Sequence, residues 1–256
     1  MSPDYSRSTK PRRVPDHLHG DLVKHRVQKE GEDGSDYGRA PKEVHGVERA
    51  GRILRSKFEA FYEYQAHVMD DPGLTKTEKA GRVAEALRKL EEKGEEIGAK
   101  ATAPVLDAMN RAVRNAQDEL RPRDQATAQE LRSVLRGLSP KERAGFVSEL
   151  ESEGGDGLRA IVSADRRLSG MDEQTHAQLH ERAVKRLAPD AAREHELLSA
   201  GFDAAKQLRE AFYGEIGRVK EDLAKHQGAI QASRAARAGA ENARARLEGG
   251  DGSDAA

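Results

Sequence analysis

The C-terminal part of the chain constrains the fold most, because residues 190–247 contain no proline and carry apolar side chains every three or four positions. Such spacing places these side chains on one face of an α-helix, as in a coiled-coil seam. A helix over this range would be about 87 Å long at about 1.5 Å per residue, longer than a small globular domain needs. We therefore predict a long C-terminal helix that packs against helices of its own subunit or of other copies. The predicted seam comprises Phe202, Phe212, Ile216, Val219, Leu223 and Ile230.

The composition favours solvated helices over a thick apolar core. Apolar residues make up 36% of the chain and charged residues 35%, against about 45–50% and about 25% in typical globular domains. The net charge of −1 gives no overall attraction to nucleic acid or to anionic membranes. The chain has no cysteine, which excludes disulfides, thiolate catalysis and cysteine-based zinc sites.

The two ends of the chain differ in composition from the rest. Residues 1–41 contain four prolines and few apolar side chains, so this segment cannot bury enough surface to fold alone. We expect it to be a flexible N-terminal arm that binds a partner, and we expect residues 248–256 to be a disordered tail. The N-terminus lacks the apolar core of a signal peptide, and no segment reaches the about 18 apolar residues of a membrane span. We therefore expect a protein made in the cytoplasm with no membrane span.

Residues 42–120 have the pattern of a long helical hairpin. Aromatic side chains gather on the first helix, and the stretch from Asp70 to Gly73 contains strong turn residues that should end it. Thr75 and Glu78 have the spacing of a capping box for the second helix, and Pro104 should kink or split that helix. The aromatic cluster, which we expect to pack against the second helix, is Phe58, Phe61 and Tyr62.

Residues 121–189 predict a compact module of four short helices, which two regions of long helix flank. Asp124, Ser139 and Asp172 are suited to cap three of these helices, and Pro140 follows Ser139 at the first helical position. No segment shows the sustained alternation of a β-strand. The predicted fold is therefore all-α and elongated, with residues 121–189 between the hairpin and the long C-terminal helix over 190–247.

Few residues indicate chemistry. His176 and His180 share a helix face, as two zinc ligands do, but the sequence places no third ligand near them and a solvated face is the favoured interpretation. The segments 121–144 and 231–247 each carry a net charge of +3, and either could contact phosphate. We predict no catalytic residue, no metal site and no cofactor. The candidate phosphate contacts in the second segment are Arg234, Arg237, Arg244 and Arg246.

The middle of the chain contains the sequences Pro-Lys-Glu-Arg at 140–143, Gly-Leu-Arg-Ala-Ile-Val at 157–162 and Leu-Ser-Gly-Met at 168–171. Through these motifs, about residues 140–220 resemble helical proteins encoded near the head genes of tailed bacteriophages. The resemblance implies a virion component or head-assembly protein: a scaffold, a head-lining protein or an internal protein that is ejected. It carries over no functional residues.

The hypothesis is therefore a non-enzymatic structural protein that binds copies of itself and other proteins of a larger assembly. The alternative is a dimeric coiled-coil regulatory adaptor that holds nucleic acid weakly through a basic patch. An enzyme is the third choice, and only the two histidines favour it.

Overall fold

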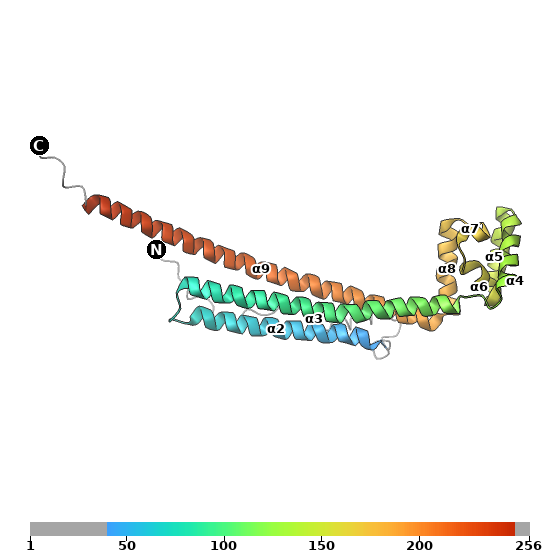
Figure 1. The fold of residues 1–256 in the computed structure, drawn as a ribbon, viewed down its shortest axis with the longest axis horizontal. Coiled ribbons are helices and arrows are strands. Elements are labelled where there is room, and N and C mark those ends of the chain that lie inside the picture. The colour runs from blue at the N-terminus through green and yellow to red at the C-terminus, as the bar shows by residue number, and fades with distance from the viewer. Residues whose placement is uncertain (1–39, 249–256) are drawn as a thin grey trace, which may run out of the picture. The chain divides into compact units, whose positions relative to one another are not determined.

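The computed structural model describes residues 40–248, except for several side chains between 226 and 248, and these residues form eight α-helices and no strand. The all-α prediction is thereby confirmed. Three helices are long: α2 over Lys42–Asp70, α3 over Lys76–Glu119 and α9 over Pro189–Glu248 (Figure 1). The predicted arm, apart from its last two residues, and the predicted tail beyond Glu248 lie outside the described residues.

The chain forms two compact units. In the described part, unit 1 comprises Arg49–Ala99 and residues 206–248, and unit 2 comprises residues 40–48 and Lys100–Ala205. Each unit therefore combines segments that are far apart in the sequence, whereas the sequence-based division follows consecutive segments. Each of the three long helices contributes residues to both units.

Unit 1 is a packing of α2, α3 and α9 around aromatic side chains. The ring centroids of Phe58 and Phe212 lie 5.2 Å apart. Gly94 faces the Phe212 ring so closely that a Cβ atom at position 94 would lie 2.0 Å from the ring's Cζ. The absence of a side chain at Gly94 on α3 therefore makes room for the buried Phe212 ring of α9. The core consists of Leu54, Phe58, Phe61, Tyr62, Val68, Val83, Leu87, Leu90, Phe212, Ile216 and Val219.

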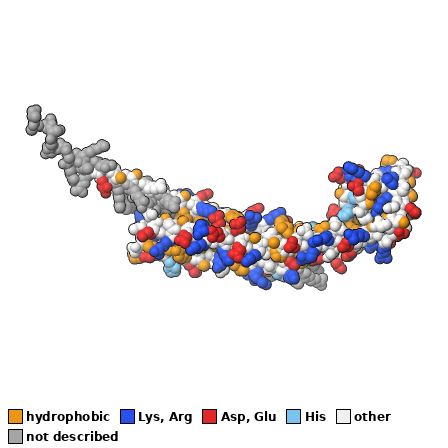
Figure 2. Space-filling view, in the orientation of Figure 1, with side chains coloured by type: hydrophobic (Ala, Val, Ile, Leu, Met, Phe, Trp, Pro, Cys, Tyr) orange, Lys and Arg blue, Asp and Glu red, His pale blue; other side chains and the backbone are white. Residues whose placement is uncertain are grey.

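The hairpin of α2 and α3 forms as predicted. The Asp71 carboxylate accepts a hydrogen bond from the Gly73 amide over 2.8 Å in the turn. At the start of α3, the Glu78 side chain accepts from the Thr75 amide over 2.8 Å, and the Glu78 amide donates to the Thr75 hydroxyl over 3.3 Å. This reciprocal pair is the capping box that the spacing predicts. The surface of the long helices carries interspersed acidic and basic side chains (Figure 2), as in the ion pair of Lys89 with Glu85 at 2.7 Å.

Pro104 was expected to kink or split the second helix; a split does not occur, because α3 continues through Pro104 without interruption. A proline removes one backbone hydrogen bond in a helix. Burial of the flanking Val105, Ala108 and Ala112, which are at most 1% exposed, offsets that loss.

Unit 2 contains the short helices α4 (Gln125–Gly137), α5 (Pro140–Glu153), α6 (Gly155–Val162), α7 (Arg166–Ser169) and α8 (Glu173–Leu187). The side chains of Asp124, Ser139 and Asp172 accept hydrogen bonds from backbone amides in the first turns of α4, α5 and α8, which confirms the predicted caps. The one-turn helix α7 was not expected. The core of the module includes Leu120, Leu135, Leu150, Leu158, Ile161, Val162 and Leu179.

Candidate interaction surfaces

The predicted seam of α9 packs within the subunit along part of its length. Phe212, Ile216 and Val219 are buried in the core of unit 1, and Leu223 is half-buried against the same core. The aromatic cluster of α2 belongs to this core too, so the structure brings these two predicted sets together. Between Phe212 and Leu223, the seam is therefore occupied by the subunit's own helices.

The seam differs from the prediction at both ends. Phe202 is only half-buried and lies in unit 2, and the side chain of Ile230 lies outside the described residues. Small residues carry the packing near Phe202: a Cβ atom at Gly201 would lie 2.9 Å from the Val44 side chain. The spacing of apolar residues had placed the bulky Phe202, rather than this glycine, in the predicted seam. The buried positions on this part of α9 are Leu197, Leu198, Ala200, Gly201, Ala204 and Leu208.

A buried carboxylate lies beside the aromatic core of unit 1, and sequence analysis missed it. Glu215 is 3% exposed. One of its oxygens accepts a hydrogen bond from the Tyr62 hydroxyl, and the other contacts Nη1 of Arg218 at 3.2 Å. A buried charge is costly unless it is paired and hydrogen-bonded, so this group fixes α9 against α2. The sequence carries no local signal for this pair, because Glu215 and Tyr62 lie 153 positions apart on different helices.

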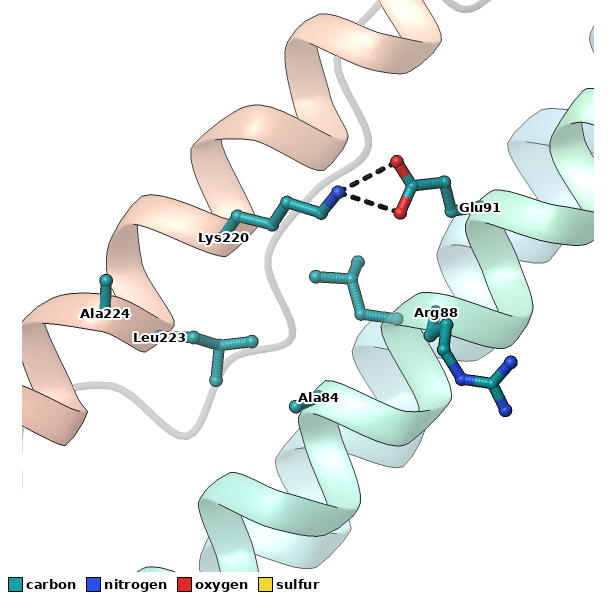
Figure 3. A pocket seen from close by; sticks show the side chains of 7 residues that line it. Ala84, Arg88, Glu91, Lys220, Leu223 and Ala224 are labelled. Atoms are coloured by element: carbon teal, nitrogen blue, oxygen red, sulfur yellow. Dashed lines mark hydrogen bonds and ion pairs between the residues drawn. The ribbon is translucent and has the colours of Figure 1, made fainter.

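A shallow groove opens where α9 separates from α3. It has a volume of about 340 Å³ and is lined by Leu87 and Glu91 of α3 and by Lys220 and Leu223 of α9, among others (Figure 3). The Lys220 ammonium and the Glu91 carboxylate meet across it at 2.8 Å. Past this ion pair, Leu223 still packs against the core of unit 1, and the described side chains of α9 from Ala224 onward are exposed.

The remainder of α9, residues 224–248, which we call the α9 extension, projects beyond this groove as a continuous helix. Every side chain described between Ala224 and Glu241 is exposed. The candidate phosphate contacts at positions 234, 237, 244 and 246 all belong to this extension, and their side chains lie outside the described residues.

Four arginines of unit 2 donate hydrogen bonds to backbone carbonyls at the C-terminal ends of neighbouring helices. These carbonyls have no partner within their helix and carry the negative end of its dipole. Arg143 makes the most contacts: its Nε and Nη2 donate to the carbonyls of Leu135 and Leu138 over 2.9 Å, and its Nη1 donates to that of Gly170. The other three are Arg132, Arg159 and Arg186.

Phosphate contact by the basic segment 121–144 stays a prediction, but two of its arginines are already occupied within the module. Arg132 is 9% exposed, burial lowers the pKa of its guanidinium, and Arg143 is committed to three carbonyls. Arg121 pairs with Asp118 at 3.2 Å. Four of the ten arginines between residues 121 and 189 thus hold helix ends together.

His176 and His180 share a face of α8, as predicted, with ring centroids 6.5 Å apart. Burial, and secondly the neighbouring His176, lower the pKa of His180. Within residues 40–248, the described side chains form no group of three or more histidines and carboxylates that could hold a metal ion. None of the described helices combines the length and the apolarity that crossing a bilayer requires.

Comparison with protein-family models, with curated proteins and with solved structures yields no match.

Proposed function

We propose that this chain is a non-enzymatic structural protein that acts by helix–helix association with copies of itself and with other proteins of a larger assembly. The observation that supports the proposal most is the α9 extension. An isolated helix in water is marginally stable, and most helices in proteins depend on packing of one face. An extension with exposed side chains, attached to a well-packed base in unit 1, is suited to receive a partner.

The particular assembly that we propose is a bacteriophage virion or a head-assembly intermediate, in which the chain is a scaffold, a head-lining protein or an internal protein. The resemblance of residues 140–220 to helical head-associated proteins of tailed phages supports this part of the proposal. Self-association through helices is also what such a role requires chemically, because a particle is built from many copies of few chains.

The second candidate is a regulatory adaptor that dimerises and holds nucleic acid. The observation that favours it is the charge of the α9 extension, where residues 231–247 contain four arginines and one glutamate. Phosphate contacts by arginine release counterions, so binding of this kind weakens steeply as salt is added.

The test has two parts. Sedimentation velocity of the full chain over a wide range of concentrations should show reversible self-association, and mass spectrometry of particles from the source of the chain should detect it in stoichiometric amounts. A chain that stays monomeric at every concentration and is absent from particles would refute the proposal. A salt-sensitive mobility shift with duplex DNA, in a chain that is absent from particles, would favour the adaptor instead.

A further inference from the structure

The exposed side of the C-terminal half of α2 is acidic and carries an exposed aromatic ring, whereas the preceding half carries the exposed Arg49, Arg52 and Lys57. Residues 58–71 contain four acidic side chains and no lysine or arginine. Tyr64 is 41% exposed, and the neighbouring Glu63 and Asp70 are exposed as well. Neither of these two acids forms an ion pair with another described residue. We call this surface the α2 outer face; it consists of Ala60, Glu63, Tyr64, His67 and Asp70.

The α2 outer face points away from the core of its own unit. Phe58 and Tyr62 contact α9 through Phe212 and Glu215. Positions 60, 64 and 67 follow one another at helical spacing on a side of α2 that bears no buried residue.

The α9 extension is complementary to this surface in charge and in spacing. Its arginines at 237 and 244 are seven residues apart, and so are Glu63 and Asp70. Seven residues of helix span about 10.5 Å, so two helices lying side by side could pair both arginines with both acids. Arginine also stacks favourably on the face of an exposed tyrosine such as Tyr64.

The two surfaces of one chain cannot meet while α9 stays helical. α9 runs parallel to α2, because Phe58 lies against Phe212 and Tyr62 against Glu215. With the same rise per residue, Asp70 at the end of α2 falls level with Leu223. The α9 extension therefore begins where α2 ends and continues past it, so only another copy can bring an extension onto the α2 outer face.

We infer that the α9 extension of one copy docks on the α2 outer face of a second copy. This inference rests on the proposed function, since it names the surfaces through which the chain would self-associate. The contact joins two different surfaces, so it can close reciprocally in a two-fold pair, in which each extension docks on the other copy, or repeat head to tail into a ring or a filament.

The experiment exchanges the charges on the two surfaces of the full-length chain. Sedimentation velocity compares the variant R237E/R244E with the variant E63R/D70R. Each replaces two attractive contacts by repulsive ones, so we expect about tenfold or greater weakening of self-association in either variant alone. A mixture of the two should associate again, because every interface then pairs opposite charges. A chain that carries all four changes should also self-associate.

The matched control is E95R/D107R, which reverses two exposed acids of α3 and should self-associate as the parent does. Circular dichroism establishes that each variant keeps its helical content. Parent-like association of both single-surface variants would overturn the inference and leave the proposed function standing. Loss without recovery in the mixture would also overturn it. If the parent never self-associates and R237E/R244E instead abolishes a DNA mobility shift, the extension binds nucleic acid and the inference fails together with the proposed function.

Discussion

Unit 1 and the short-helix module of unit 2 solve the problem of helix stability in different ways. In unit 1, long helices bury aromatic side chains against each other, and few helix ends need partners. In the module, five helices between Gln125 and Leu187 present many ends for little buried length. Each end leaves backbone groups without helical partners, which caps and the four carbonyl-binding arginines satisfy. Side-chain packing therefore dominates one region, and helix-end chemistry contributes far more in the other.

The largest effect should come from removing the central ring of unit 1. Phe212→Ala should lower the free energy of unfolding by about 3–5 kcal/mol, because it leaves a cavity between Phe58 and Gly94. Urea unfolding followed by circular dichroism measures this loss. Phe202→Ala, on the half-buried side of the same helix, is the control and should cost clearly less. A loss below about 0.5 kcal/mol at position 212, as at an ordinary surface site, would contradict the packing described for unit 1.

In the module, a marked effect should come from an arginine and not only from the buried apolar residues. Arg143→Met keeps much of the side chain's length but removes the donors to the carbonyls of Leu135, Leu138 and Gly170. The loss should be about 2 kcal/mol, because hydrogen bonds from charged donors are stronger than neutral ones. Arg136→Met, at an exposed position, is the matched control and should change little. Equal effects of the two substitutions in urea unfolding would count against the carbonyl-binding role.

A smaller effect should follow from loss of one helix cap in the module. The Ser139 side chain accepts a hydrogen bond from the Glu142 amide, and the Glu142 carboxylate accepts one from the Ser139 amide over 3.0 Å. Ser139→Ala should cost about 1 kcal/mol of unfolding free energy. Ser133→Ala, within α4, removes an exposed hydroxyl and no cap, so it should be neutral or slightly stabilising. If the cap variant unfolds at the same urea concentration as the parent, helix ends matter less here than we argue.

The smallest effect should be a pH dependence that belongs to the module. Burial and the neighbouring His176 lower the pKa of His180 from 6.5, so the unfolded chain binds a proton at a higher pH than the folded protein does. The free energy of unfolding should therefore fall as the pH falls from 6.5 towards the lower pKa of the folded state. His180→Gln should reduce this slope in unfolding curves measured across that range, and His67→Gln, at an exposed site on α2, should not. An unchanged slope would show that His180 titrates alike in both states.

Local patterns predicted the helices well because their signals lie within a few residues. Asp124, Ser139 and Asp172 were recognised as caps from their own neighbourhoods, and the stripe through Phe212, Ile216 and Val219 was recognised from its period. The partners across helices were not predictable in this way. Nothing in the sequence near Glu215 indicates that the Tyr62 hydroxyl, on another helix, donates a hydrogen bond to its buried carboxylate.

The basic segment of the module shows the same limit for candidate sites. Charge counting over 121–144 cannot distinguish an arginine in solvent from one that binds a carbonyl, as Arg143 does. That distinction depends on which helix ends the fold brings near each guanidinium. Apolar periodicity also overlooked Gly201. A glycine contributes to packing because it has no side chain, which lets the Val44 side chain come close.

α9 runs without a break from the core of unit 1 into its extension. The rotation of the extension about the helix axis is therefore fixed relative to the packed part of α9. One residue inserted between Leu223 and Gly228 would turn everything after it by about 100° around the helix axis, whereas seven inserted residues would turn it by only about 20°. Length changes in this stretch therefore preserve the rotational position of the extension, relative to Phe212, only in steps close to whole turns.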